Sequence, residues 1–136
     1  MAIRVGDRAT SKFVVDDATM RWFREVSGDA SRIHCDAAYA KSLGYDDVIV
    51  YGGIVLMHLS NLLGTRIPGM NGTSIAWSIN YHRPLYVGEA SEILLEVVYV
   101  SPATRIVEGR FRIMAGEKSV ATGTTQSIVP AGEIEV

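Results

Sequence analysis

The sequence predicts an α+β fold in which an antiparallel β-sheet packs against one buried helix. One strand-like segment is followed by helical segments and then by four consecutive strand-like segments. Residues 54–63 are apolar on nearly every side, which is typical of a buried helix. Short breaks separate the last strands, and short connections favour antiparallel neighbours.

The first strand is expected at residues 10–15, and a helix follows it directly. Asp16 and Asp17 are suitable amino-terminal caps, because a carboxylate can accept hydrogen bonds from the unpaired N–H groups of a first helical turn. This helix should run to about residue 26, and Gly28 is a natural stop just beyond it. Its apolar stripe, spaced at i+3 and i+4, consists of Trp22, Phe23 and Val26.

Two further helices are expected before the sheet is completed. Asp36 can cap a short helix over residues 37–42, which Gly44 ends. The buried helix over residues 54–63 is expected to end at Gly64. Valine, isoleucine, tyrosine and threonine are abundant after it, and these residues favour strands. The four expected strands are residues 74–82, 91–100, 105–114 and 119–129.

Length, charge and composition limit the possible function classes. We expect residues 1–136 to form a single domain, long enough to bury a core without disulfides. The net charge of −2, without a cluster of lysine or arginine, argues against nucleic acid as a partner. The longest apolar stretch, residues 48–63, is too short and too polar to span a bilayer, and the amino terminus has no apolar signal segment. One cysteine, which cannot form an internal disulfide, fits a reducing compartment, so we expect a cytoplasmic protein that does not bind membranes.

The stretch from Ser27 to Asp36 places an acid, Asp29, five residues before an imidazole, His34. That spacing matches neither a helix face nor a strand face. If both side chains meet one small molecule, the segment between them must be a turn or an irregular loop, and loops on a rigid scaffold often carry catalytic groups. The alternative is a capping aspartate and a surface histidine.

Gly52 and Gly53 come directly before the predicted buried helix. Glycines at that point let a ligand oxygen approach the unpaired N–H groups of the first turn, which can hold a developing oxyanion. Alternatively, they only allow the chain to turn and the helix to pack closely. Taken together with Asp29 and His34, they favour the catalytic interpretation.

Other reactive side chains indicate less. His34, His58 and His82 are far apart in the sequence and belong to no recognised ligand motif, so we expect no metal and no cofactor. Cys35 is adjacent to His34, but neighbouring residues usually point in different directions. We interpret Cys35 as a half-buried bystander rather than a nucleophile.

These residues resemble the signature of the MaoC-like dehydratases, or (R)-specific enoyl-CoA hydratases, which reads Gly-Asp-x-Asn-Pro-[Leu/Ile/Val]-His-x-Asp. The matching residues are Gly28, Asp29, Ile33, His34 and Asp36. Residues 48–52, Val-Ile-Val-Tyr-Gly, resemble the family's Ile-Val-His-Gly at the start of its central helix, and residues 62–64 and 84–89 also fit. The similarity therefore covers most of the chain.

The resemblance implies a single hot-dog domain, in which a long antiparallel sheet curls around one central helix. It implies a homodimer or higher homo-oligomer with two sheets paired edge to edge and acyl-thioester sites near the interface. The substrate would be a thioester of coenzyme A or of acyl carrier protein. The sequence fixes neither the carrier nor the length of the acyl chain.

The resemblance also implies a lyase mechanism. The residues matching Asp29 and His34 would hold and activate a water that adds across the double bond of a trans-2-enoyl thioester, giving the (R)-3-hydroxyacyl product. The backbone N–H matching Gly52 would donate to the thioester oxygen. Such an enzyme is a hydratase/dehydratase that combines acid–base catalysis with an oxyanion site. The sequence does not divide the proton transfers between Asp29 and His34.

The chain departs from the family motif at three positions. Ser31 and Arg32 replace the family's Asn-Pro, and Tyr51 replaces its histidine. Arg32 adds a cation that could meet a phosphate or an acidic substrate group, or could be a solvated surface arginine. Ser60 and Leu63 fall where the family lines its acyl pocket, although plain helix packing would also explain them. The predicted substrate-binding residues are thus Ser31, Arg32, Tyr51, Gly53, Ser60 and Leu63.

Two other functions remain open at this point. A hot-dog thioesterase also uses a carboxylate and an oxyanion donor at a helix start, but the spacing from Asp29 to His34 favours the hydratase. A non-catalytic subunit that binds acyl thioesters would be compatible with the changes at Ser31 and Arg32.

Overall fold

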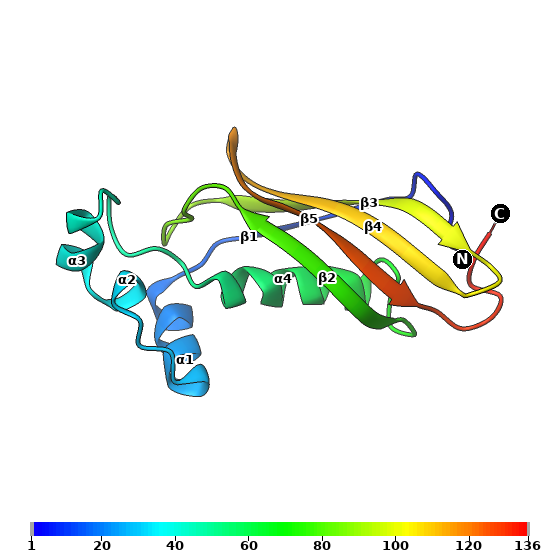
Figure 1. The fold of residues 1–136 in the computed structure, drawn as a ribbon, viewed down its shortest axis with the longest axis horizontal. Helices are drawn as coiled ribbons and strands as arrows, with labels where there is room; N and C mark the ends of the chain where they lie inside the picture. Colours follow the sequence, from blue (N-terminus) through cyan, green and yellow to red (C-terminus); the bar gives the residue numbers. More distant parts are fainter. Residues whose placement is uncertain (1, 136) are drawn as a thin grey trace.

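The computed structural model describes residues 2–135 and confirms the predicted fold class (Figure 1). The strands are β1 (Arg8–Phe13), β2 (Thr73–Tyr81), β3 (Ser91–Ser101), β4 (Ile106–Ala115) and β5 (Lys118–Ile128). The helices are α1 (Asp17–Ser27), α2 (Arg32–Cys35), α3 (Ala37–Ser42) and α4 (Gly52–Thr65). Within residues 2–135 the five strands form one antiparallel sheet in the order β1-β3-β4-β5-β2. Helix α4 lies along one face of this sheet, and α1, α2 and α3 gather beyond one end of it (Figure 1).

The caps of α1 and α3 are those that the sequence predicts. Asp16 accepts a hydrogen bond from the backbone N–H of Thr19 at 2.8 Å, and Gly28 ends α1 in the left-handed region with φ 78°. Asp36 caps α3 by accepting from the N–H of Tyr39 at 3.0 Å. Each cap satisfies backbone N–H donors that a helix leaves unpaired, and for that reason the capping residues predict where these helices begin.

The limits of the buried helix differ from the prediction. Helix α4 begins at Gly52 and ends at Thr65, two residues beyond the predicted range 54–63 on each side. The N–H groups of a first turn have no intrahelical acceptor in any helix, so glycines can occupy that turn without breaking a bond of the ladder. Gly64 lies inside α4 rather than ending it. The chain leaves the helix just before Pro68, because a residue that precedes proline disfavours helical backbone angles.

The core lies between α4 and the inner face of the sheet. Ile54 and Leu59 of α4 are fully buried there, as are Ile93, Phe111 and Ile113 of the central strands. Burial of one such side chain contributes about 1.5–3 kcal/mol to folding. This packing fixes the position of α4, and with it the position of the helix start relative to the loops at the same end.

The apolar stripe predicted on α1 faces the core only in part. Trp22 is 48% exposed and Val26 is 68% exposed, whereas Met20 is buried and Phe23 packs partly against the core. Helix α1 lies beyond the end of the sheet (Figure 1), so one of its faces has no neighbour in this chain. Of the stripe predicted on α1, Phe23 thus contacts the core, whereas Trp22 and Val26 remain exposed.

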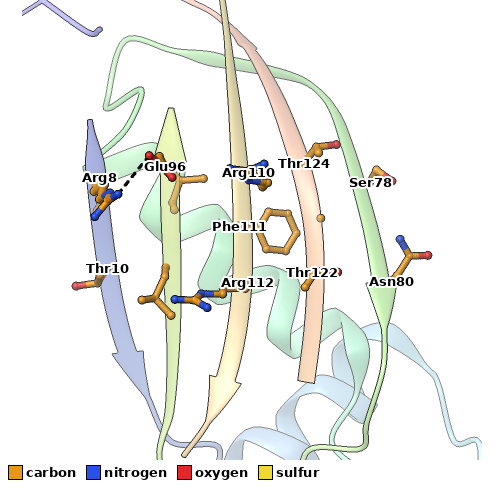
Figure 2. A pocket seen from close by; sticks show the side chains of 14 residues that line it. Arg8, Thr10, Ser78, Asn80, Glu96, Arg110, Phe111, Arg112, Thr122 and Thr124 are labelled. Atoms are coloured by element: carbon orange, nitrogen blue, oxygen red, sulfur yellow. Dashed lines mark hydrogen bonds and ion pairs between the residues drawn. The ribbon is translucent and has the colours of Figure 1, made fainter. Parts of the chain in front are cut away.

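The outer face of the sheet is polar, as expected for an antiparallel sheet with one solvated side. Arg8 of β1 lies opposite Glu96 of β3, which lies opposite Arg110 of β4, and Arg110 lies opposite Thr124 of β5. Figure 2 shows this face, with α4 behind the strands, and the ion pair between Arg8 and Glu96 at 3.5 Å. These side chains, together with Arg112, line a hollow of about 630 Å³.

Strand β1 lies two residues upstream of the predicted range 10–15, because Arg8 to Phe13 pair with Glu96 to Ser91 of β3. The other strands agree with their predicted ranges to within one residue at each end. None of the helices within residues 2–135 combines the length and the apolar character that crossing a bilayer requires.

Candidate active site

The segment between Asp29 and His34 is irregular only in its first half. Residues 29–31 have no regular structure, but α2 forms one helical turn, in which the N–H of Asp36 donates to the carbonyl of Arg32 at 2.8 Å. The expectation of a loop or turn throughout is thus wrong for the second half. A helical turn advances the chain by only about 1.5 Å per residue. Asp29 and His34 therefore lie near enough for the imidazolium charge to affect the carboxylate.

His34 is held in one orientation by the loop that precedes α4. Its Nδ1 lies 2.7 Å from the carbonyl oxygen of Ile49. Because a carbonyl oxygen can only accept, Nδ1 donates, and in the neutral ring Nε2 carries the free lone pair. The half-buried ring also stacks on Tyr51, with 4.2 Å between the centroids. His34 is thus oriented to exchange a proton through Nε2.

Asp29 is prepared to stay ionised. Its Oδ1 accepts hydrogen bonds from the hydroxyl of Ser31 and from the backbone N–H of Ser31, the latter at 2.9 Å. These two bonds, with the positive charge of His34, lower the pKa of the Asp29 carboxyl and outweigh its partial desolvation. Ser31, which replaces the family's asparagine, therefore contacts the acid directly.

The start of α4 combines close packing with free N–H groups. Its N-cap residue, Tyr51, supplies no side-chain cap to the first turn. The hydroxyl of Tyr81 donates to the carbonyl of Gly52 at 2.9 Å, and a Cβ on Gly52 would lie 2.7 Å from that hydroxyl. A Cβ on Gly53 would lie 2.5 Å from Cζ of Phe23. Packing thus requires both glycines, and the role of Gly52 as an oxyanion donor stays a prediction.

A cavity of about 370 Å³ lies between His34 and the start of α4, and Asp29 is not among the residues that line it. His34 and Gly52 both line it. Its apolar wall includes Val55, Leu85 and Val120. The cavity can therefore hold an uncharged chain while an imidazole and the positive end of a helix meet its reacting atoms.

A smaller cavity of about 200 Å³ borders His34 as well, and Cys35 and Tyr51 line it. Cys35 is exposed rather than half-buried as predicted, because it ends a one-turn helix at the periphery. Its sulfur lies 3.4 Å from the hydroxyl of Tyr51. Its assignment as a bystander stays a prediction.

The remaining predicted site residues lie apart from the larger cavity. Arg32 pairs with Asp36 at 3.2 Å and lies 4.2 Å from the ring centroid of Tyr39, which favours a structural role for its cation. Ser60 is exposed on α4, and Leu63 is buried in the core. Neither lines the 370 Å³ cavity, so their assignment to an acyl pocket stays a prediction.

Two contributors to the site were not predicted. The carbonyl of Ile49 orients His34, and the hydroxyl of Tyr81 covers Gly52. They act over 15 and 29 residues of sequence separation, and no local pattern marks either one. Within residues 2–135 the structure gathers no three His, Cys, Asp or Glu side chains at one point where a metal ion could be held.

The single antiparallel sheet packed against α4 defines a hot-dog domain, and Asp29 and His34 near the start of that helix form a candidate acid–base pair. No family model matches the chain. The chain is 26% identical over 131 residues to the 3-hydroxybutyryl-CoA dehydratase of Methylorubrum extorquens, covering 96% of this chain and 83% of that protein. It is 25% identical over 135 residues to the (R)-specific enoyl-CoA hydratase of Aeromonas caviae, covering 99% of this chain and 90% of that protein.

Solved structures agree with these sequence matches. The (R)-hydratase from Aeromonas caviae involved in PHA biosynthesis has a TM-score of 0.87 and 26% identity, covering 94% of this chain and 98% of that chain. An (R)-hydratase from Pseudomonas aeruginosa has a TM-score of 0.85 and 25% identity, covering 95% of this chain and 83% of that chain. In sequence and in fold the chain is similar to the (R)-specific hydratases, and the predicted resemblance is confirmed.

Proposed function

We propose that this protein is a hydratase/dehydratase that interconverts trans-2-enoyl and (R)-3-hydroxyacyl thioesters. One observation carries the proposal: His34 and the first turn of α4 line the same cavity of about 370 Å³. A thioester in that cavity can meet a proton acceptor at one point and an N–H donor at another. Asp29, which Ser31 keeps ionised, supplies a carboxylate in addition to the imidazole of His34. The two groups together can hold and activate one water.

Hydration then proceeds by a balanced addition. The Asp29–His34 pair removes one proton from a bound water, and the oxygen forms a bond to carbon 3 of the enoyl group. The electron pair of the double bond moves toward the thioester oxygen, where the N–H of Gly52 stabilises the charge. Carbon 2 then takes a proton from the Asp29–His34 pair, which is thereby restored to its starting state, and elimination is the reverse. Proton transfer of this kind contributes ~10²–10⁴-fold, and one oxyanion donor ~10²–10³-fold.

The cavity favours a short acyl chain. Its volume of about 370 Å³ is at the lower end of the range of ~300–1,000 Å³ that is common for ligand pockets. The wall of Val55, Leu85 and Val120 suits hydrocarbon rather than a charged chain. The relatives named for 3-hydroxybutyryl-CoA and enoyl-CoA support coenzyme A as the carrier.

A homodimer is the proposed state of the enzyme. In the described sheet β2 pairs only with β5, so its outer edge offers unpaired backbone groups. Ile75, Trp77 and Tyr81 of β2 are 47%, 37% and 49% exposed. Pairing of two β2 edges would satisfy the backbone and cover these side chains. Light scattering coupled to size-exclusion chromatography measures the mass directly, and a monomer at micromolar concentration would contradict the dimer.

The test of activity is hydration of crotonyl-CoA and longer enoyl-CoAs, followed by loss of the absorbance of the conjugated thioester. The same acyl groups on carrier protein distinguish the two carriers, and chiral analysis of the product tests the (R) configuration. Asp29→Asn should lose most of the activity, and Asp46→Asn, at an exposed loop position, is the matched control. Equal hydration of the whole panel by wild type and Asp29→Asn would refute the assignment.

The same assay separates the two alternatives. Release of free thiol from acyl-CoA would identify a thioesterase. Thioester binding without turnover of any kind would identify a non-catalytic subunit.

A further inference from the structure

Tyr51 contacts more parts of the site than any pattern in the sequence indicates. It is only 2% exposed, so almost none of its surface is left for a substrate. It immediately precedes α4 and is the N-cap residue of that helix. The backbone of Tyr51 therefore belongs to the helix start, while its side chain extends toward the loop of Asp29 and toward His34.

The ring of Tyr51 supports the imidazole. The two rings stack with 4.2 Å between centroids and an interplanar angle of 27°. Phe23 packs against the same tyrosine ring at 4.6 Å. Together with the bond from Nδ1 to Ile49, the stack restricts both the plane and the rotation of the His34 ring.

The hydroxyl of Tyr51 holds the acid loop. It donates to the backbone carbonyl of Asp29 at 2.6 Å, across 22 residues of sequence. Burial raises the pKa of Tyr51 to about 12, so the hydroxyl keeps its proton through the whole range of an activity assay. It is therefore a permanent donor rather than a group that exchanges protons with a substrate.

We propose that Tyr51 is a positioning residue that keeps Asp29 and His34 in a fixed relation to the first turn of α4. The inference rests on the proposed function for its catalytic consequence, but its structural content is independent of turnover. A misplacement of reacting groups by about 1 Å can cost ~10²-fold in rate. One side chain that connects the acid, the imidazole and the helix start controls such displacements in all three.

Kinetics of two variants test the two contacts separately. Tyr51→Phe keeps the ring stack and loses the hydroxyl, and should lower kcat about tenfold with less than about a twofold change in KM. Tyr51→Leu loses both contacts and should lower kcat further. Tyr99→Phe removes an exposed tyrosine hydroxyl from β3 and is the matched control. Wild-type kcat in Tyr51→Phe would overturn the role of the hydroxyl.

A titration of the Asp29 carboxyl tests whether Tyr51 positions the acid loop, and it requires no turnover. In ¹³C-labelled protein the pKa of the Asp29 carboxyl should rise toward its ordinary value in Tyr51→Phe, because a released loop weakens the bonds to Ser31 and the approach to His34. The pKa of Asp36, which its bonds to Tyr39 and Arg32 lower, should not move and is the internal control. An unchanged Asp29 pKa would overturn the proposal.

The two proposals can fail separately. If wild type shows no turnover but Asp29 titrates as expected, the hydratase assignment fails and the positioning role stands. If wild type is active and Tyr51→Phe matches it in kcat and in the Asp29 pKa, only the positioning role fails. Cooperative thermal melts confirm folding, and Tyr51→His, which keeps an aromatic ring and loses the phenol, replaces any Phe variant that does not fold.

Discussion

Two hollows of the molecule differ in what they can do. The hollow on the outer face of the sheet measures about 630 Å³, and the cavity at the start of α4 about 370 Å³. The larger one is lined by Arg8, Arg110 and Arg112, and its one carboxylate, Glu96, is paired with Arg8. The smaller one is lined by His34 and by the first residue of α4. The comparison teaches that the volume of a hollow does not indicate where a reaction site lies. Polar groups of fixed orientation that converge on one space are the better guide.

The surroundings explain this difference. The outer hollow lies on a solvated face, where water keeps the arginines hydrated and screens their charges. The cavity at the start of α4 instead combines an apolar wall, Val55, Leu85 and Val120, with His34 and the first residue of the helix, so an uncharged chain and its reacting group can be held there together.

The largest expected effect comes from removing the imidazole. His34→Ala should lower kcat by ~10²–10⁴-fold, because it removes the imidazole whose Nδ1 is fixed by Ile49 and whose Nε2 can exchange a proton at the cavity wall. Arg110→Gln and Arg112→Gln, on the outer hollow, should leave kcat and KM unchanged within about twofold. Steady-state hydration kinetics measure all three. A comparable loss in either arginine variant would break the comparison, since it would give the outer face a share in turnover.

The next effect concerns the start of α4. In Gly52→Ala the new Cβ would lie 2.7 Å from the hydroxyl and 2.9 Å from Cζ of Tyr81, so the Tyr81 side chain must move away and give up its bond to the carbonyl of Gly52, or the helix start must shift. We expect kcat/KM to fall by about 10–100-fold, short of the full loss of an oxyanion donor. The decisive measurement is kcat/KM for one enoyl-CoA alongside a thermal melt. Full activity in a folded Gly52→Ala would show that the N–H at this position tolerates displacement.

A smaller, pH-dependent effect is expected for Ser31→Ala. The hydroxyl of Ser31 is the largest cause of the lowered pKa of Asp29, so its removal should raise that pKa. A depressed carboxyl pKa stabilises the fold above the unfolded pKa, and this contribution disappears as pH falls through the folded pKa. Acid unfolding of Ser31→Ala should therefore begin at higher pH, with activity at neutral pH changed only about threefold. Ser42→Ala, which removes a hydroxyl bonded to Tyr39, is the control, and superimposable acid-unfolding curves would contradict the assignment.

The smallest effect on activity is expected at the other end of the same helix. A Cβ at Gly64 meets no atom within 4 Å, and Gly64 is exposed inside α4. Gly64→Ala should therefore stabilise the protein by about 0.5–1 kcal/mol through helix propensity, with unchanged kcat. Denaturant unfolding measures the change in the free energy of unfolding. Destabilisation would show that a partner covers this helix face, and would sharpen the contrast with Gly52.

The parts of the fold that depend on local chemistry were predictable. Asp16 and Asp36 cap their helices through bonds three residues away, and strand composition located the sheet to within two residues. The ends of α4 were not predictable from its glycines. A glycine in the first turn breaks no intrahelical bond. Gly64 stays helical because the buried residues beside it on α4 hold that turn against the core.

The site divides in the same way. Asp29, His34 and Gly52 were found because their spacing and motif lie within the local sequence. The carbonyl of Ile49 and the hydroxyl of Tyr81 reach the site only through the fold, which no local pattern encodes. The exposure of Trp22 and Val26 on α1 was not predictable for a related reason: helical periodicity says which residues share a face, but not whether any neighbour covers that face.

The open edge of β2 could make the activity of the site depend on protein concentration. Tyr81 belongs to that strand, and its hydroxyl also donates to the carbonyl of Gly52. If a second copy pairs along β2, the strand that supports the helix start is held fully in place only in the associated form. Specific activity should then fall when the enzyme is diluted below the dissociation constant of the pair. Substrate, which binds the completed site, would protect against that loss.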